Sequence, residues 1–241
     1  MFPFINEVLL VASIFVIYSI VLAALAIFRE KGLYLMTIIC TIAANIEVLI
    51  LVNAFGMEMT LGNVLFSAMF LTSDIASELY GKKVAKTTVL LGIAANIIFL
   101  IISQSWMLYV PNENDFAHGA IKTVFSNTPR LIIASLSVYV VCQLFDVWAY
   151  HKWWEFTTKK FGDSKKFLWL RNNGSTLISQ LINTVLFNFA AFLGTYSIGT
   201  IISIIISCYL IFIITALADT PFVYLARLIH NRQLKIEKIL P

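Results

Sequence analysis

The sequence contains little charge for its length. Only 12 % of its 241 residues are Asp, Glu, Lys or Arg, whereas soluble domains carry about 25 %. Hydrophobic residues make up 60 %, and the mean hydropathy is +0.88. So few charges could not cover the surface of a soluble domain of this size. The composition therefore excludes a soluble enzyme, a disordered chain and a nucleic-acid-binding domain, and it indicates an integral membrane protein.

The usual patterns of catalysis and metal binding are also missing. The three histidines form no HxxxH pair, and the three cysteines form no CxxC pair and lie inside apolar runs. The nucleophile elbow GxSxG, the zinc motif HExxH, the dinucleotide motif GxGxxG and the P-loop do not occur. We therefore expect no enzyme activity, no metal, no cofactor and no ATP hydrolysis by the chain itself.

The apolar residues form runs of the length that crosses a membrane, about 20 residues. Six runs meet this length: 8–28, 33–55, 84–110, 131–154, 175–194 and 200–228. The run 60–73 has only fourteen residues before Asp74. It crosses if the polar segment that follows continues the helix, and otherwise it is a re-entrant or interfacial segment. The residues before position 28 lack a basic start and a cleavage site, so we expect them to remain as a helix.

The distribution of Lys and Arg favours seven crossings. If all seven runs cross, fifteen of the seventeen cations fall on one side, and only Lys122 and Arg130 fall on the other. Cytoplasmic loops carry an excess of Lys and Arg, so this asymmetry predicts an outside N-terminus and a cytoplasmic C-terminus. We expect an all-α bundle of six to seven transmembrane helices in the inner membrane of a bacterial cell.

Several acidic residues interrupt the apolar runs, and each is a functional-site hypothesis because charge is costly in hydrocarbon. Asp74 and Glu78 share a helix face that Lys82 continues. The alternative for Glu78 is an exposed ion pair with Lys82. The other polar residues of this set are Glu47, midway along the second run between Asn45 and Asn53; Gln143 and Asp146, in the run 131–154; and Asp219, which alternatively compensates the backbone freed by Pro221.

A polar stripe marks the run 175–194. Its members recur at intervals that place them on one face of a helix. They are Thr176, Gln180, Asn183, Thr184 and Phe187, and Ser175 precedes them. Such side chains either hydrogen-bond neighbouring helices or bind a substrate. Two amides in one stripe, with carboxylates elsewhere in the bundle, favour the substrate site.

Four segments, 70–83, 143–152, 170–184 and 219–224, resemble the queuosine precursor transporter family, also called the vitamin uptake transporter family. The resemblance extends over about residues 33–228. It implies import of 7-deazaguanine bases, such as 7-cyano-7-deazaguanine, 7-aminomethyl-7-deazaguanine or queuine, for queuosine modification of tRNA. Many relatives have Asp at the position of Asn183 and Lys at that of Ile211. The expected organisation is one domain, 1–241, with an additional N-terminal helix (1–31), a transporter core (33–228) and a cytoplasmic basic tail (229–241).

The chemistry of a deazaguanine suggests roles for these candidates. Its adjacent N–H donors suit a carboxylate, and its flat face suits an aromatic ring. We expect Glu47 or Asp74 to bind this edge; Glu47 is favoured for it, and Asp74 is then structural or couples transport to an ion. The other substrate-binding candidates are Asn45, Gln180 and Asn183 as amides, Phe70 or Phe187 for stacking, and Asp146, Ser175, Thr176 and Thr184. The other structural or coupling candidates are Glu78, Lys82, Gln143 and Asp219.

The partners expected from the sequence are a small deazapurine substrate and the lipid bilayer, with no nucleic acid. A homo-oligomer and an energising partner stay open. The alternative function is a substrate-binding subunit of a vitamin or nucleobase uptake system driven by a separate ATPase module. The two readings differ in whether the chain alone accumulates substrate.

Overall fold

The computed structural model describes residues 4–126, 129–194 and 196–237, which fold into eight helices and one β-hairpin. The elements are α1 (Ile5–Phe28), α2 (Glu30–Glu47), β1 (Leu51–Ala54), β2 (Met57–Thr60), α3 (Gly62–Tyr80), α4 (Lys82–Trp106), α5 (His118–Phe125), α6 (Pro129–Phe161), α7 (Leu168–Phe192) and α8 (Ile198–Glu237). The architecture is an all-α bundle, as expected, with the hairpin as an addition that hydropathy did not indicate.

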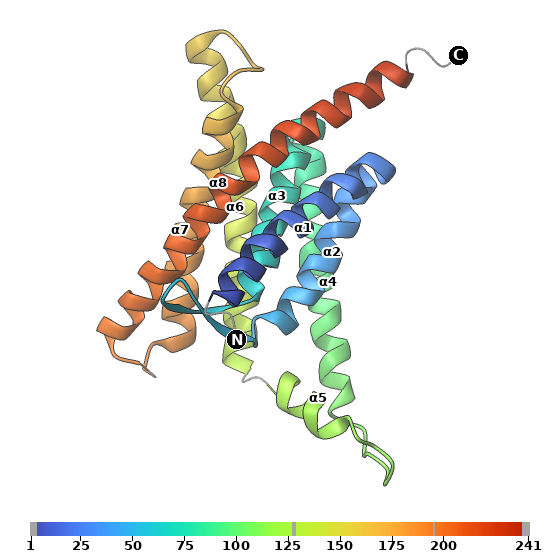
Figure 1. Ribbon diagram of the computed structural model, residues 1–241, viewed down its shortest axis with the longest axis vertical. Coiled ribbons are helices and arrows are strands. Elements are labelled where there is room, and N and C mark those ends of the chain that lie inside the picture. The colour runs from blue at the N-terminus through green and yellow to red at the C-terminus, as the bar shows by residue number, and fades with distance from the viewer. Residues whose placement is uncertain (1–3, 127–128, 195, 238–241) are drawn as a thin grey trace.

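The long helices run back and forth between two ends of the molecule (Figure 1). The hairpin, the loop with α5 and the connection from α7 to α8 lie at one end, here called the hairpin end. The connections α1–α2, α3–α4 and α6–α7 and the end of α8 lie at the other. Most of the Lys and Arg residues lie in these connections, in the helix ends beside them or along the end of α8, so we call this the cation-rich end.

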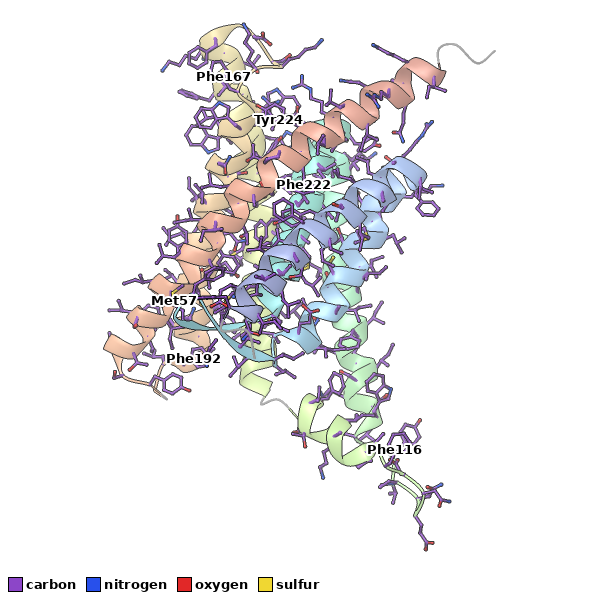
Figure 2. All side chains as sticks on the ribbon, in the orientation of Figure 1. Met57, Phe116, Phe167, Phe192, Phe222 and Tyr224 are labelled. Atoms are coloured by element: carbon purple, nitrogen blue, oxygen red, sulfur yellow. The ribbon has the colours of Figure 1, made fainter. Side chains whose placement is uncertain are left out.

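The burial pattern is that of a membrane protein. Many apolar side chains on the outside of the bundle are exposed, among them Ile27, Ile101 and Ile214, each more than 60 % exposed. Side chains project from the helices on all sides of the bundle (Figure 2). Four described helices are long and apolar enough to cross a bilayer by length and composition: α1, α4, α7 and the part of α8 from Ile198 to Ile236. An apolar surface this extensive is stable in contact with lipid.

Helix α3 lies at the centre of the bundle, in contact with α1, α2, α4, α6 and α8. Its polar segment, from Thr72 to Ser77, is fully buried. This segment continues the fourteen-residue apolar run without a break, as the sequence allowed, and the resulting 19-residue helix is about 28 Å long. That length approaches the thickness of the hydrocarbon core, about 30 Å.

The second run does not form one helix over 33–55. Helix α2 ends at Glu47, and β1 pairs with β2 in an antiparallel hairpin that places Asn53 opposite Glu58. Phe55 and Gly56 form its two-residue turn, both at positive φ (52° and 72°). Apolar content alone does not distinguish a short strand from a helix segment. The prediction that Glu47 lies in mid-span is therefore wrong, since it stands at the end of a helix.

Other boundaries differ from the expected ones as well, and α4 ends at Trp106 rather than at residue 110. Helix α7 starts at Leu168 rather than Ser175, and α6 continues to Phe161. Helix α8 continues to Glu237, so most of the tail 229–241 is helical, and 238–241 lie outside the described residues. At Gly81 the backbone takes φ 83° and separates α3 from α4, so Lys82 does not continue the helix face of Glu78.

Candidate functional site

A cavity of about 570 Å³ lies between the helices in the half of the bundle nearer the hairpin end. Helices α2, α3, α4, α6, α7 and α8 all contribute lining residues, and Leu51, Met59 and Thr60 contribute from the hairpin segment. Phe192, one of its lining residues, lies at the same end as Met57 of the hairpin (Figure 2). The volume is within the range of small-molecule sites.

The cavity wall combines amides with aromatic rings. Five asparagines line it: Asn45, Asn63, Asn96, Asn183 and Asn188. Six rings line it as well: Phe66, Tyr139, Phe187, Phe192, Tyr196 and Phe212. Among the lining residues that the structure describes, none is acidic or basic. The wall can therefore stack a flat ring and exchange hydrogen bonds with it, but it offers no charge to pair with an ionic ligand.

Hydrogen bonds hold parts of this wall in place. The Asn45 amide donates to Thr41 O (2.8 Å) and to Asn96 Oδ1 (3.2 Å), so α2 and α4 are joined beside the cavity. The Asn188 amide donates to Thr184 O at 2.8 Å, within α7. Amides whose donors are fixed in this way keep their orientation, and this reduces the entropy that ordering a ligand costs.

An apolar layer closes the cavity toward the cation-rich end. Phe70 is fully buried and packs with Val138 and Cys142. Its ring centre lies 5.4 Å from that of Phe66, which lines the cavity. Phe70 is thus part of the floor rather than of the cavity wall, among the lining residues described.

Beyond this layer lie three fully or almost fully buried acids, Asp74, Asp146 and Asp219, here called the carboxylate cluster. Each accepts one bond from α7. Thr176 Oγ1 donates to Asp74 Oδ2 (2.9 Å), Ser179 Oγ to Asp146 Oδ1 (2.8 Å) and Asn172 Nδ2 to Asp219 Oδ1 (2.7 Å). Asp219 therefore interacts with α7 through its side chain.

At the cation-rich end, Glu78 forms a bidentate ion pair with Arg171. Arg171 Nε donates to Glu78 Oε2 at 2.9 Å, and Arg171 Nη2 donates to Glu78 Oε1 at 2.7 Å. The Arg171 side chain is 0 % exposed and that of Glu78 3 %. Tyr150 Oη also donates to Glu78 Oε2 (2.8 Å), and the guanidinium lies 4.3 Å from the centre of the Trp154 ring. The partner of Glu78 is thus Arg171, because Gly81 turns the chain before Lys82.

Some of the predicted site residues line the cavity, and others are buried nearer the carboxylate cluster. Asn45, Asn183, Thr184 and Phe187 line the cavity. Ser175, Thr176 and Gln180 are buried deeper, as are Gln143 and the acids of the carboxylate cluster. Glu47 is partly exposed and is absent from the described cavity lining. The carboxylate expected to bind the substrate edge is therefore not in the cavity wall.

Several residues of the cavity and of the buried ion pair were not among the candidates predicted from the sequence. Asn63, Asn96 and Asn188 line the cavity, and Arg171 forms the buried ion pair. Asn188 stands four residues after Thr184, so a longer polar stripe would have found it. Asn96 interrupts an apolar run, which is itself a signal. Arg171 was counted among the cytoplasmic cations, because a loop position and a buried helical position look alike in a charge count.

Comparisons with known proteins agree with this architecture. A sequence profile of the family described as "Putative vitamin uptake transporter" matches residues 60–226. The chain belongs to this family. A relative from Bacillus subtilis (strain 168), named "Probable queuosine precursor transporter", is 34 % identical over 200 residues, which are 83 % of this chain and 85 % of the relative. No solved structure gives a significant match.

Family membership confirms the resemblance seen in the sequence. This vitamin uptake transporter homologue is a multi-pass membrane protein and a transporter rather than an enzyme. Its partners accordingly include the lipid bilayer and a small-molecule substrate.

Proposed function

We propose that this chain imports 7-deazaguanine bases, such as 7-cyano-7-deazaguanine, into a bacterial cell for queuosine modification of tRNA. The printed name of the Bacillus subtilis relative supports this class of substrate. The observation that carries the proposal is the uncharged cavity wall of asparagines and aromatic rings. A 7-deazaguanine is neutral, flat and rich in hydrogen-bonding groups along one edge, and it matches such a wall.

In this proposal the recognition of the base rests on amides rather than on a carboxylate. Asn183 exchanges hydrogen bonds with the base edge, Asn45 accepts from it through Oδ1 because its N–H groups are engaged, and Phe187 or Phe66 stacks on its face. An amide offers both a donor and an acceptor, which the alternating groups of a guanine edge require. Because Asn183 replaces the Asp of many relatives, the wall also carries no charge that would need a cation in an apolar surrounding.

The transport path leads from the hairpin end to the cation-rich end. The cavity lies in the hairpin half, and Phe70, the carboxylate cluster and the Glu78–Arg171 pair separate it from the other end. We place the hairpin end outside the cell and the C-terminus in the cytoplasm, with seven crossings by α1, α2, α3, α4, α6, α7 and α8. The conformation is then open outward, and import requires these three layers to separate.

Uptake by proteoliposomes that contain only this chain tests the proposal. Vesicles preloaded with unlabelled 7-cyano-7-deazaguanine are expected to take up the tritiated base by exchange, while vesicles preloaded with uracil are not. Guanine and queuine added outside measure the preference for the deazapurine ring. Binding of the base without any uptake would instead support the alternative of a binding subunit that needs an ATPase module. Absence of both binding and uptake would overturn the proposed substrate.

A further inference from the structure

The carboxylate cluster contains an unusual contact between two acids. Asp74 of α3 and Asp146 of α6 are within hydrogen-bonding reach of each other. Both side chains are 0 % exposed. Among the described residues, no donor reaches Asp74 Oδ1 or Asp146 Oδ2. Two ionised carboxylates can only accept, so this contact becomes a hydrogen bond only when one of the two acids holds a proton.

In the part of the chain that the structure describes, no cation compensates the charge of this pair. Asp219 of α8 adds a third acid, and its Oδ1 already accepts from Asn172. Arg171 is engaged with Glu78. Helices α2 and α4, which also pack against α3, contribute no charged group to the pair among the described residues. The other titratable groups that interact with the cluster are Tyr18 of α1 and Cys142 and Tyr150 of α6. Two negative charges are costly there, and a shared proton removes one of them.

A buried amide beside the pair supplies a second, independent sign of a ligand. Gln143 lies one helical turn before Asp146 on the same face of α6 and is 1 % exposed. Neither its amide nitrogen nor its oxygen has a partner among the described residues. Buried polar groups in proteins are normally hydrogen-bonded, and those left unpaired are characteristic of functional sites. Thr176 and Ser179, which hold the two acids, come from the helix that also carries Asn183 of the cavity wall.

We propose that Asp74 and Asp146 form a proton-binding site, and that one proton moves inward with each base. The inference rests on the proposed function for the identity of the base. The proton enters from the cavity side, occupies the carboxyl pair and leaves toward the cation-rich end, so no covalent bond changes. The site stands between the cavity and the Glu78–Arg171 pair, where both ends of the path can reach it in turn. A proton, rather than Na⁺, fits because no group of three or more His, Cys, Asp or Glu side chains in the described residues is placed to hold a metal ion, whereas a single proton suffices for two neighbouring carboxyl groups.

The experiment uses proteoliposomes of the full-length wild-type chain in potassium buffer without sodium. Exchange of tritiated 7-cyano-7-deazaguanine without any gradient first tests the proposed function. An outside pH one unit below the inside pH is then imposed, and valinomycin clamps the membrane potential at zero. One proton per base supports accumulation of up to about tenfold. A pH-sensitive dye inside the vesicles is expected to report acidification when the base is added outside.

Variants locate the proton on the carboxyl pair. Asp146→Asn can still donate to Asp74 but cannot gain or lose a proton, so its uptake is expected to lose its dependence on the pH gradient and its dye signal. Asp74→Asn is expected to behave in the same way. Glu155→Gln, an exposed acid at the cation-rich end, is the matched control and keeps both. Size-exclusion profiles of each variant verify folding.

The outcomes separate the two proposals. Exchange without pH-driven accumulation or acidification in the wild type would overturn proton coupling and leave the proposed function standing. Accumulation driven by a sodium gradient, with no effect of pH, would assign the site to Na⁺ instead and overturn the inference. Proton movement that persists in both Asp variants would show that the proton binds elsewhere and would overturn the inference. No exchange at all would overturn the proposed substrate and this inference with it.

Discussion

Arg171 shows how a single residue can hold the cation-rich end of the bundle together. Its side chain is fully buried, and its donors reach Glu78 and Lys166 O while its face lies over Trp154. Arg227 adds a second cation 3.8 Å from Glu78 Oε1. A buried ion pair gives little net stability compared with apolar residues, but removal of one partner leaves an uncompensated charge. The pair therefore joins α3 to α7, and the connection requires both side chains.

We expect Arg171→Gln to destabilise the protein by about 3–5 kcal/mol, because Glu78 would stay buried without its bidentate partner. Thermal unfolding in detergent measures the change. Glu78→Gln combined with Arg171→Gln should recover part of the loss, since neither charge then remains. The matched control is Lys152→Gln, which breaks an exposed pair with Glu155 at 2.8 Å and should have no measurable effect. An equal loss of stability in Arg171→Gln and in Lys152→Gln would contradict the structural role given to the Glu78–Arg171 pair.

A second residue-scale prediction concerns the cavity wall. Asn183→Ala removes an amide from the proposed base site and leaves a polar group of the bound ligand unpaired, which costs about 1–3 kcal/mol. The affinity for 7-cyano-7-deazaguanine should fall about tenfold or more in calorimetric titrations of the purified protein. Leu181→Ala, on the outer face of the same helix and 41 % exposed, should bind as the wild type does. Unchanged affinity in Asn183→Ala would place base recognition elsewhere.

At the scale of elements, the hairpin adds β-structure to a cavity wall that is otherwise mostly helical. It is tethered to α1, because Asn6 Nδ2 donates to Asn53 O (2.9 Å) and Phe55 N donates to Glu7 Oε1 (3.0 Å). The Leu61 amide also donates to Ile50 O at 3.0 Å and closes the base of the hairpin. An isolated two-stranded hairpin is marginally stable. Its order therefore depends on these tethers and on its turn.

Gly56→Ala tests the turn. At φ 72° a Cβ strains the backbone, at a cost of about 1–2 kcal/mol, although nothing lies within 4 Å of the added atom. Amide hydrogen exchange in residues 51–60 should become about fivefold faster or more. Gly119→Ala is the matched control, since its Cβ also meets nothing within 4 Å but the glycine lies in helix α5 without a positive φ. Equal exchange in the two variants would show that the tethers alone order the hairpin.

For the whole molecule, the two ends differ in charge. Most of the described cations lie in or beside the connections α1–α2, α3–α4 and α6–α7 and along the end of α8, at one end of the bundle (Figure 1), whereas Lys122 of α5 and Arg130 of α6 belong to the hairpin end. Such loops remain in the cytoplasm because translocation of Lys and Arg is unfavourable. The bundle thus carries its cavity in the half opposite its cations.

Cysteine labelling in intact cells measures this orientation. In a chain whose Cys40, Cys142 and Cys208 are replaced by alanine, Asn114→Cys in the loop before α5 should react with a membrane-impermeant maleimide. Lys165→Cys, between α6 and α7, should react only after permeabilisation. The reverse pattern would invert the proposed topology. Labelling of both sites in intact cells would contradict the single crossing by α6 that separates them.

The sequence by itself determined the class of the protein, because composition and run length reflect the solvent that surrounds the chain. Low charge and long apolar runs predicted a helical membrane protein, and the motifs around Asp74 and Asn183 predicted its family. The length of the fourteen-residue run left its crossing open, and the distribution of Lys and Arg favoured its continuation through the polar segment. These features are local or summed over the chain, so no knowledge of distant contacts was needed.

Only the tertiary structure decided which polar residues meet. The sequence placed Glu47 midway along a full-length apolar run and Asp74 after a short one, yet α2 ends at Glu47 and Asp74 is fully buried in the bundle. The partner of Glu78 proved to be Arg171, 93 residues away, rather than Lys82. Asn63, Asn96 and Asn188 come from three helices and share one cavity. Spacing along a chain fixes the face of a helix, but the neighbour of that face depends on packing among helices far apart in sequence.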